Sequence, residues 1–204
     1  MFVLWKVSSS IDFLSSSSSN FAGGLIENGS RNRVFVPGPF HIMNEASFCT
    51  AITNKFMEEK AFAYKIPDPT KEEIRRGARK RPFDIVAWKG DISFALEAKF
   101  MKGYFAFNFD RIEEHQFWWL DCAKRAFELE PRKTFFCGII VAFWEPRKLY
   151  DVFVFDIDYL KARMSTGEKS IKQKELLDFK ERKLCFPLKE LTPAKILESA
   201  IYGT

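Results

Sequence analysis

Residues 83–100 read FDIVAWKGDISFALEAKF, and this stretch decides the fold. Apolar and polar residues alternate in both of its halves, as they do in strands that bury one face of a sheet. Lys89, Gly90 and Asp91 separate the two runs and are typical of a tight turn between strands. The sequence therefore predicts a β-hairpin of two neighbouring antiparallel strands.

The same alternation sorts the side chains of the second strand onto two faces. One face is wholly apolar and suits a core, whereas the other carries two small residues followed by Glu97 and Lys99. Antiparallel pairing can bring Asp84 of the first strand close to Glu97. The hairpin would then hold two carboxylates at one place, with a lysine beside them.

This arrangement has a chemical and a purely structural interpretation. Two adjacent carboxylates repel each other unless a cation lies between them, and Mg²⁺ or its substitute Mn²⁺ prefers such oxygen ligands. A metal there can polarise a phosphodiester and activate water, while Lys99 orients the water or stabilises developing charge. The alternative is a surface ion pair of Glu97 and Lys99, with Asp84 in an unrelated turn. Spacing alone does not separate the two.

The segments around the hairpin predict an α/β domain. A helix follows the N-cap Asn44, residues 61–67 form a strand, and residues 71–81 form a basic loop or helical turn. A helix over about 110–129, strands at 134–144 and 149–157, and a charged helical tail from about 161 complete the order. Such an order predicts a mixed central sheet flanked by helices.

Two polar residues face inward on the predicted helices. Glu45 opens the apolar stripe of the first helix, and Gln116, next to His115, lies in the middle of the stripe of the second. That second stripe comprises Ile112, Gln116, Trp119, Ala123 and Phe127, and the outer face carries Glu113, Glu114, Asp121, Lys124, Arg125 and Glu128. A glutamine whose hydrogen bonds are satisfied, or an acid near a helix N-terminus, explains either residue alone. Beside a polar strand face, the two together favour a functional centre.

At this point the sequence resembles the PD-(D/E)XK nuclease superfamily, with RPFD (81–84) and EAK (97–99) as the two half-motifs. Within it, the chain is similar to the RecU-type Holliday-junction resolvases and, more distantly, to the archaeal Hjc enzymes. The similarity spans roughly residues 44–180. It follows the ordered series of the Glu45 helix, YKIPDPT, FDIVAW, FALEAKF, IEEHQFWWL and EKSIKQKELLDF.

The resemblance implies a restriction-endonuclease-like core and a homodimeric endonuclease that nicks two strands of a four-way DNA junction symmetrically, in recombination or repair. It implies that Asp84, Glu97 and Glu45 bind Mg²⁺, that Lys99 assists the attacking water, and that Gln116 holds the water or a phosphate. Because the segment between YKIPDPT and RPFD is short, we expect the protruding stalk of the bacterial members to be small or absent.

Basic residues cluster near the predicted site. The chain has 32 Lys and Arg against 27 Asp and Glu, and its net charge of +5 weakly favours an anionic partner. We expect contacts with DNA phosphates from Lys65, Arg75, Arg76, Arg79, Lys80, Arg81 and Lys102. The alternative is a solvated loop, which the interspersed Glu72 and Glu73 would suit.

Residues 1–42 differ in composition from the rest. SSSIDFLSSSSSN, GGLIENGSRNR and VPGPF predict a low-complexity, disordered extension ahead of a nuclease domain over 43–204. A second interpretation is that translation begins at Met43. The four scattered cysteines argue against zinc and suit a cytoplasmic protein with reduced thiols, and we expect no membrane helix.

Three functional hypotheses follow. The first is a Holliday-junction resolvase. The second is a restriction- or repair-type nuclease of the same superfamily that acts on ordinary duplex. The third is a non-catalytic protein on the same fold that binds DNA or a recombinase. Intact Asp84, Glu97 and Lys99 argue against the third, since a degenerate site would be expected to have lost one of them.

Overall fold

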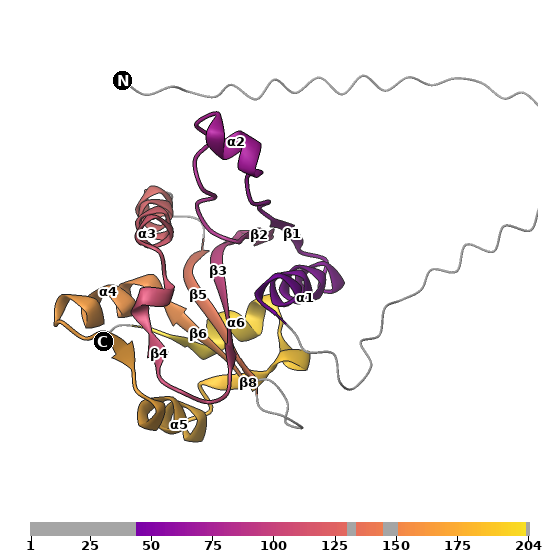
Figure 1. The fold of residues 1–204 in the computed structure, drawn as a ribbon. Helices are drawn as coiled ribbons and strands as arrows, with labels where there is room; N and C mark the ends of the chain where they lie inside the picture. Colours follow the sequence, from indigo (N-terminus) through magenta and orange to yellow (C-terminus); the bar gives the residue numbers. More distant parts are fainter. Residues whose placement is uncertain (1–43, 130–133, 145–150, 203–204) are drawn as a thin grey trace, which may run out of the picture. The chain divides into compact units, whose positions relative to one another are not determined.

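The computed structural model describes residues 44–129, 134–144 and 151–202 (Figure 1). The predicted extension over 1–42 lies outside these residues. The helices are α1 (Glu45–Glu58), α2 (Lys71–Arg75), α3 (Glu114–Glu128), α4 (Ile157–Ser165), α5 (Gln173–Glu181) and α6 (Pro193–Ser199), with 3-10 turns η1 (Phe109–Arg111) and η2 (Leu188–Glu190). The strands are β1 (Phe62–Lys65), β2 (Ile85–Lys89), β3 (Ile92–Lys102), β4 (Phe107–Asn108), β5 (Thr134–Trp144), β6 (Asp151–Asp156), β7 (Ser170–Ile171), β8 (Cys185–Pro187) and β9 (Ala200–Ile201).

A mixed sheet lies at the centre of the described residues. Its order is β1-β2-β3-β5-β6-β8, and β9 also pairs with β6. β1, β2 and β3 are antiparallel, whereas β5 runs parallel to β3 because α3 carries the chain back across the sheet. The α/β class and the mixed central sheet flanked by helices are therefore confirmed.

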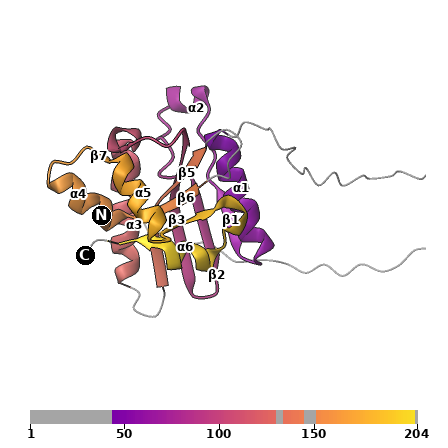
Figure 2. The ribbon, with the colours of Figure 1, turned by 90° about the horizontal axis from the view of Figure 1, so that it is seen from below.

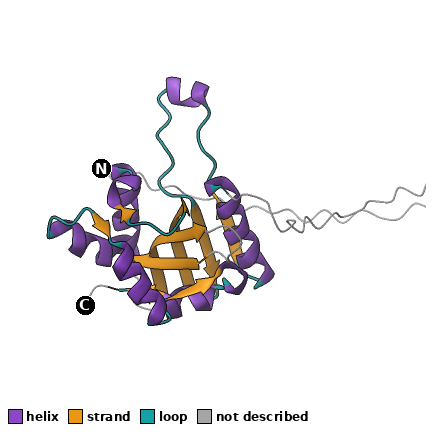
Figure 3. Cartoon of the chain, turned by 60° about the horizontal axis from the view of Figure 1, so that its bottom comes forward, coloured by secondary structure: helices purple, strands orange, loops and turns teal. Residues whose placement is uncertain are grey.

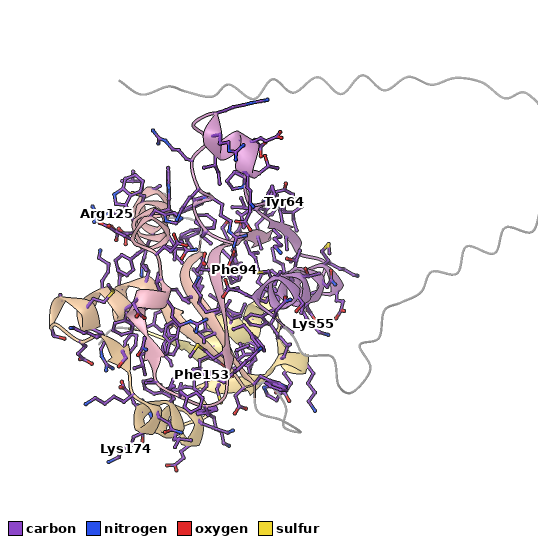
Figure 4. All side chains as sticks on the ribbon, viewed as in Figure 1. Lys55, Tyr64, Phe94, Arg125, Phe153 and Lys174 are labelled. Atoms are coloured by element: carbon purple, nitrogen blue, oxygen red, sulfur yellow. The ribbon has the colours of Figure 1, made fainter. Side chains whose placement is uncertain are left out.

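Helices α1 and α3 cover opposite faces of the sheet, so two cores form (Figure 2). Phe48 and Ile52 of α1 pack with Phe94 of β3 in one core. Leu120 of α3 packs with Phe153 of β6 in the other. Figure 4 shows Phe94 and Phe153 inside the domain, where both are fully buried. The sheet thus separates two apolar layers, one under α1 and one under α3.

The predicted hairpin is confirmed. Ile85 pairs with Leu96 and Lys89 with Ile92, and Gly90 in the turn has a φ of 59°, which favours glycine. The predicted alternation of β3 also holds, because Leu96 belongs to the core under α1, whereas Ala95 belongs to the core on the α3 side. Glu97 and Lys99 follow Ala95 by steps of two and lie on the α3 side.

The first helix forms as its pattern predicts. Asn44 is the N-cap: its side chain accepts a hydrogen bond from the Ser47 N–H, and the Ser47 hydroxyl accepts one from the Asn44 N–H. The buried residues of α1 are Phe48, Cys49, Ile52 and Phe56. The capping box fixes where the helix begins, and it thereby places Glu45 in the first turn, at the end of the sheet.

The segment between β1 and β2 protrudes from the sheet and carries only the five-residue helix α2, so the stalk is present but small. Figure 3 shows α2 held away from the sheet on two loops. Thr70 and Glu73 form a capping box that starts α2 straight after the turn-forming DPT, and Gly77, with a φ of 90°, follows the helix. No side chain of α2 is buried, so the whole of this short helix is available for contacts.

The second predicted helix differs from the sequence pattern in two ways. It begins at Glu114 rather than near 110, because Glu113 serves as its N-cap. Leu120 is fully buried although it lies outside the predicted stripe. The prediction that Asp121 and Lys124 face solvent was wrong, because α4 packs against that side of α3. There Lys161 pairs with Asp121 at 2.5 Å, and Lys124 with Asp156 at 2.7 Å.

The tail is helical, as predicted, but it begins earlier and includes strands. Asp156 ends β6 and caps α4, because its side chain accepts a hydrogen bond from the Asp158 N–H at 2.8 Å. β8 and β9 then add to the central sheet beside β6. Among the described residues, no helix combines the length and the apolarity that crossing a membrane requires.

Candidate metal centre

The register of the hairpin places Asp84 opposite Glu97. Ile85 pairs with Leu96, and the Asp84 N–H donates to the Leu96 carbonyl at 3.1 Å, which extends the β2–β3 ladder by one residue. Both carboxyl side chains are fully buried. Adjacent strands therefore hold two acids side by side inside the protein, as the alternation pattern predicts.

A third acid, Glu45, joins them from α1, the helix that covers the opposite face of the sheet. One carboxylate oxygen each of Glu45, Asp84 and Glu97 lies within 4.8 Å of the others, and no other such cluster of three possible ligands is found in the described part of the chain. Glu45 comes from the first turn of α1, and its side chain is 37% exposed. The cluster is thus buried on the strand side and open to solvent at Glu45.

Each of the two buried carboxylates has one oxygen held in place and one without a hydrogen bond. Asp84 Oδ2 accepts from the Ala98 N–H at 2.8 Å, and Glu97 Oε1 accepts from Lys99 Nζ at 2.7 Å. Asp84 Oδ1 and Glu97 Oε2 are buried and have no hydrogen-bond partner. Buried polar atoms without partners are costly, and a divalent cation would satisfy both oxygens at once.

The electrostatics of the cluster also call for a cation. Burial and the charge of Asp84 together raise the pKa of Glu97 to about 8, against the opposing effect of Lys99. A carboxyl group in this state resists ionisation until positive charge is supplied. Three carboxylates with two unsatisfied oxygens form a donor set that fits Mg²⁺ or Mn²⁺, so the cluster could bind such an ion.

Lys99 and Gln116 are fixed against the acids. Lys99 Nζ lies 2.7 Å from Glu97 Oε1 and 3.8 Å from Glu45 Oε1. Gln116 Nε2 donates to Glu97 Oε1 at 2.6 Å, while Gln116 Oε1 accepts from the Glu113 N–H at 3.0 Å. The N-terminus of α3 therefore orients the amide, which explains a buried glutamine in the stripe of that helix. All five residues predicted for the centre are brought together.

Arg81 also belongs to this cluster, which the sequence did not indicate. Its guanidinium lies 2.6 Å from Asp84 Oδ1 and 3.1 Å from Asp68 Oδ2, and its side chain is only 15% exposed. We expected Arg81 to contact DNA as part of a basic run. Arg81 precedes Asp84 by three residues in RPFD, but this spacing does not by itself predict an ion pair between them.

The other predicted DNA-contacting residues are dispersed. Arg75, Arg76 and Arg79 are exposed on the protruding segment. Lys80, at its base, pairs with Glu113 at 2.5 Å.

The two remaining lysines of the predicted set lie apart from the protruding segment. Lys65, at the end of β1, lies 3.4 Å from the Ala46 carbonyl, close to the first turn of α1. Lys102 lies at the far end of β3, about 17 Å from Glu97 by the rise of a strand, so it is not part of the same basic group.

A group of exposed aromatic rings lies on the sheet beside the acids. The Phe62 and Trp88 rings stack with their centroids 3.9 Å apart, and both residues pair across β1 and β2. Tyr64 alternates with Phe62 on the same face, and Figure 4 shows it at the surface. The sequence predicts both strands, but it does not indicate that this face is exposed. The exposure depends on how far α3 extends over the sheet.

Comparisons with known proteins add a distant structural similarity. No protein-family model matches this chain. No curated protein matches it either. Among solved structures, Hjc from Archaeoglobus fulgidus, a Holliday junction resolvase from an archaeal hyperthermophile, is similar at 21% sequence identity with a TM-score of 0.33. The similarity covers 53% of this chain and 73% of that chain. What this chain does is therefore inferred from its own side chains.

Proposed function

We propose that this protein is a metal-dependent DNA endonuclease that resolves four-way junctions by hydrolysing two phosphodiester bonds symmetrically, in recombination or repair. One observation carries the proposal. Glu97 Oε2 is buried and has no hydrogen bond, Asp84 Oδ1 is buried and is balanced only by the charge of Arg81, and Lys99 lies beside both acids. A purely structural cluster would be expected to satisfy both oxygens with hydrogen bonds, whereas a centre built for Mg²⁺ would leave them available to the ion.

Each side chain of the centre would have its own role in hydrolysis. Asp84, Glu97 and Glu45 would hold the ion, which supplies a Lewis acid for the scissile phosphate when bound. Lys99, held by Glu97 and by Gln116 Oε1 at 3.4 Å, orients the attacking water and stabilises the charge that develops on the phosphate. Gln116 holds the water or a phosphate oxygen beside it.

The protruding segment supports the choice of DNA as substrate. Arg75, Arg76 and Arg79 are exposed on it, and the same segment leads directly into Asp84. These arginines can neutralise backbone phosphates and so position a strand at the acids without reading its sequence. Glu72 and Glu73 reduce the net positive charge of this segment, which still remains basic.

Paired nicks need two centres, and the described part of one chain holds a single acidic cluster. We therefore propose a homodimer, joined through the aromatic face of β1 and β2. The exposed fractions are 47% for Phe62, 51% for Tyr64 and 46% for Trp88. Three half-exposed rings supply about 300 Å² per copy, or about 600 Å² for the pair. That is about a third of a standard interface, so neighbouring residues would have to contribute the rest of the buried area.

A cleavage assay tests the proposed activity. Synthetic four-way junction, flap and linear duplex are incubated in parallel with Mg²⁺ or with EDTA, and strand breaks are mapped. We expect paired, symmetric nicks in the junction only when Mg²⁺ is present. Equal cleavage of duplex would instead support a restriction- or repair-type nuclease. Junction binding without any cleavage would support a non-catalytic protein that binds DNA or a recombinase. In each case we expect the protein to act in the cytoplasm.

A further inference from the structure

Arg81 contacts the same carboxylate oxygen that a metal would need. Its guanidinium lies 2.6 Å from Asp84 Oδ1, and that oxygen is one of the two without a hydrogen bond. We propose that Arg81 is a resident counter-cation of the acidic centre, that a divalent metal displaces it, and that the released guanidinium binds a DNA phosphate. This inference rests on the proposed metal centre but adds a coupling between metal and DNA.

The contact between Arg81 and Asp84 has the character of a replaceable ion pair. The two atoms are close, yet no N–H of Arg81 is directed at Oδ1 as a hydrogen bond requires. Asp84 Oδ2, in contrast, accepts a directed bond from the Ala98 N–H at 2.8 Å. The carboxylate is therefore anchored by one oxygen, and its other oxygen is only neutralised by charge, which a metal ion can do better.

The charge of Arg81 cannot be removed by losing a proton, because a guanidinium stays protonated in proteins. When a divalent ion binds Asp84 Oδ1, a fixed positive charge would remain within a few ångströms of it. Like charges at that separation repel strongly inside a protein. The guanidinium must then move away, whereas the ammonium of Lys99 stays bound to Glu97 Oε1, an oxygen that the metal does not need.

The structure offers a place for the displaced side chain. A cleft of about 250 Å³ lies between the protruding segment and the start of α3, and Arg81 lines it together with Asp68, Lys80, His115 and Gln116. Arg81 already contacts Asp68 Oδ2 at 3.1 Å, so this side of the cleft can hold the guanidinium. Lys80 adds a second positive charge, although Asp68 and Glu113 also line the cleft. Both acids are already paired, Asp68 with Arg81 and Glu113 with Lys80, so a phosphate of a bound strand would compete with these exposed acids for the two cations.

Metal and DNA should therefore favour each other's binding. A phosphate in the cleft attracts Arg81 away from Asp84 and frees the oxygen for the metal, and metal binding releases Arg81 to the phosphate. Linkage makes the two effects equal in size. In the absence of both, Arg81 keeps the acidic centre neutralised, which limits metal binding by the free protein.

Mn²⁺ binding measured by electron paramagnetic resonance tests the proposal without relying on cleavage. We compare the full chain with Arg81→Gln, with Arg81→Lys, and with Arg182→Gln as a matched change of an exposed arginine outside the proposed DNA contacts. Without DNA, Arg81→Gln should bind Mn²⁺ more tightly by about tenfold or more, because a like charge has been removed. Arg81→Lys and Arg182→Gln should remain close to the unaltered protein.

The second arm adds a four-way junction with non-hydrolysable linkages at the cleavage sites. The junction should tighten Mn²⁺ binding to the unaltered protein and to Arg182→Gln, and it should have little effect on Arg81→Gln. Unchanged or weaker Mn²⁺ binding by folded Arg81→Gln without DNA would overturn the counter-cation role. Absence of Mn²⁺ binding in every protein would instead overturn the proposed metal centre itself, so the two failures are distinguishable.

Discussion

Replacing Glu97 by glutamine should change how the stability of the metal-free protein depends on pH. Burial raises the pKa of Glu97 from 4.5 to about 8. Each pKa unit corresponds to about 1.4 kcal/mol, so ionising this group in the folded protein costs about 5 kcal/mol relative to the unfolded chain. That cost is a large fraction of the stability of a typical domain.

The sign follows from which state binds the proton more tightly. Folded Glu97 keeps its proton up to about pH 8, whereas the unfolded chain loses it near pH 4.5. The folded protein therefore has this stability in full below pH 4.5 and loses it as the pH rises to about 8. Glu97→Gln is neutral throughout and can still accept the bonds from Lys99 and Gln116, so it should not show this loss.

Urea unfolding in EDTA, at several pH values from 4.5 to 8.5, measures the effect. The stability of Glu97→Gln relative to the unaltered protein should rise by about 5 kcal/mol over this range. The exposed substitution Glu128→Gln is the control and should show no such rise. Added Mg²⁺ should restore the stability that the unaltered protein loses at high pH, and it should not change the stability of Glu97→Gln. Parallel pH profiles for the unaltered protein and Glu97→Gln would refute the reasoning.

Four further predictions concern activity and assembly. Asp84→Asn should reduce junction cleavage by about a thousandfold or more while binding in Ca²⁺ survives, because an anionic metal ligand is lost; unchanged turnover would contradict its role. The Mg²⁺ concentration for half-maximal activity should fall about tenfold per pH unit up to about pH 8, because the metal competes with the proton of Glu97; a flat profile from pH 6 to 8 would exclude this competition. Changing Arg75 and Arg76 to alanine should lower the salt slope of junction binding by about 2, measured by fluorescence anisotropy; an unchanged slope would remove the protruding segment from the DNA interface. Trp88→Arg should convert the dimer to a monomer in light scattering, because it buries a charge in the aromatic face; a dimer that survives would place the interface elsewhere.

The hairpin and its acids could be predicted from sequence because both depend on local alternation. A strand has a period of two, so the separation of Glu97 and Lys99 from the apolar Leu96 and Ala98 follows directly from their order. The tight turn at Gly90 fixes the pairing of the two strands, and the pairing places Asp84 opposite Glu97. These are short-range constraints, and the structure follows them.

The partners of Arg81 and the environment of α3 could not be predicted because they depend on long-range packing. Asp68 reaches Arg81 only because the protruding segment folds back to the sheet on two loops. Asp121 and Lys124 are charged residues at solvent-facing spacing, but α4 covers them and pairs its charges with theirs. Periodicity describes one helix at a time, so it does not show which neighbour covers a polar face.

Anomalous diffraction from crystals soaked in Mn²⁺ tests most directly whether the buried acids bind a divalent ion. We expect one strong peak per chain, about 2.2 Å from both Asp84 Oδ1 and Glu97 Oε2, with Arg81 turned away from Asp84. A peak at another site, or none at these two oxygens at a saturating concentration of Mn²⁺, would contradict it.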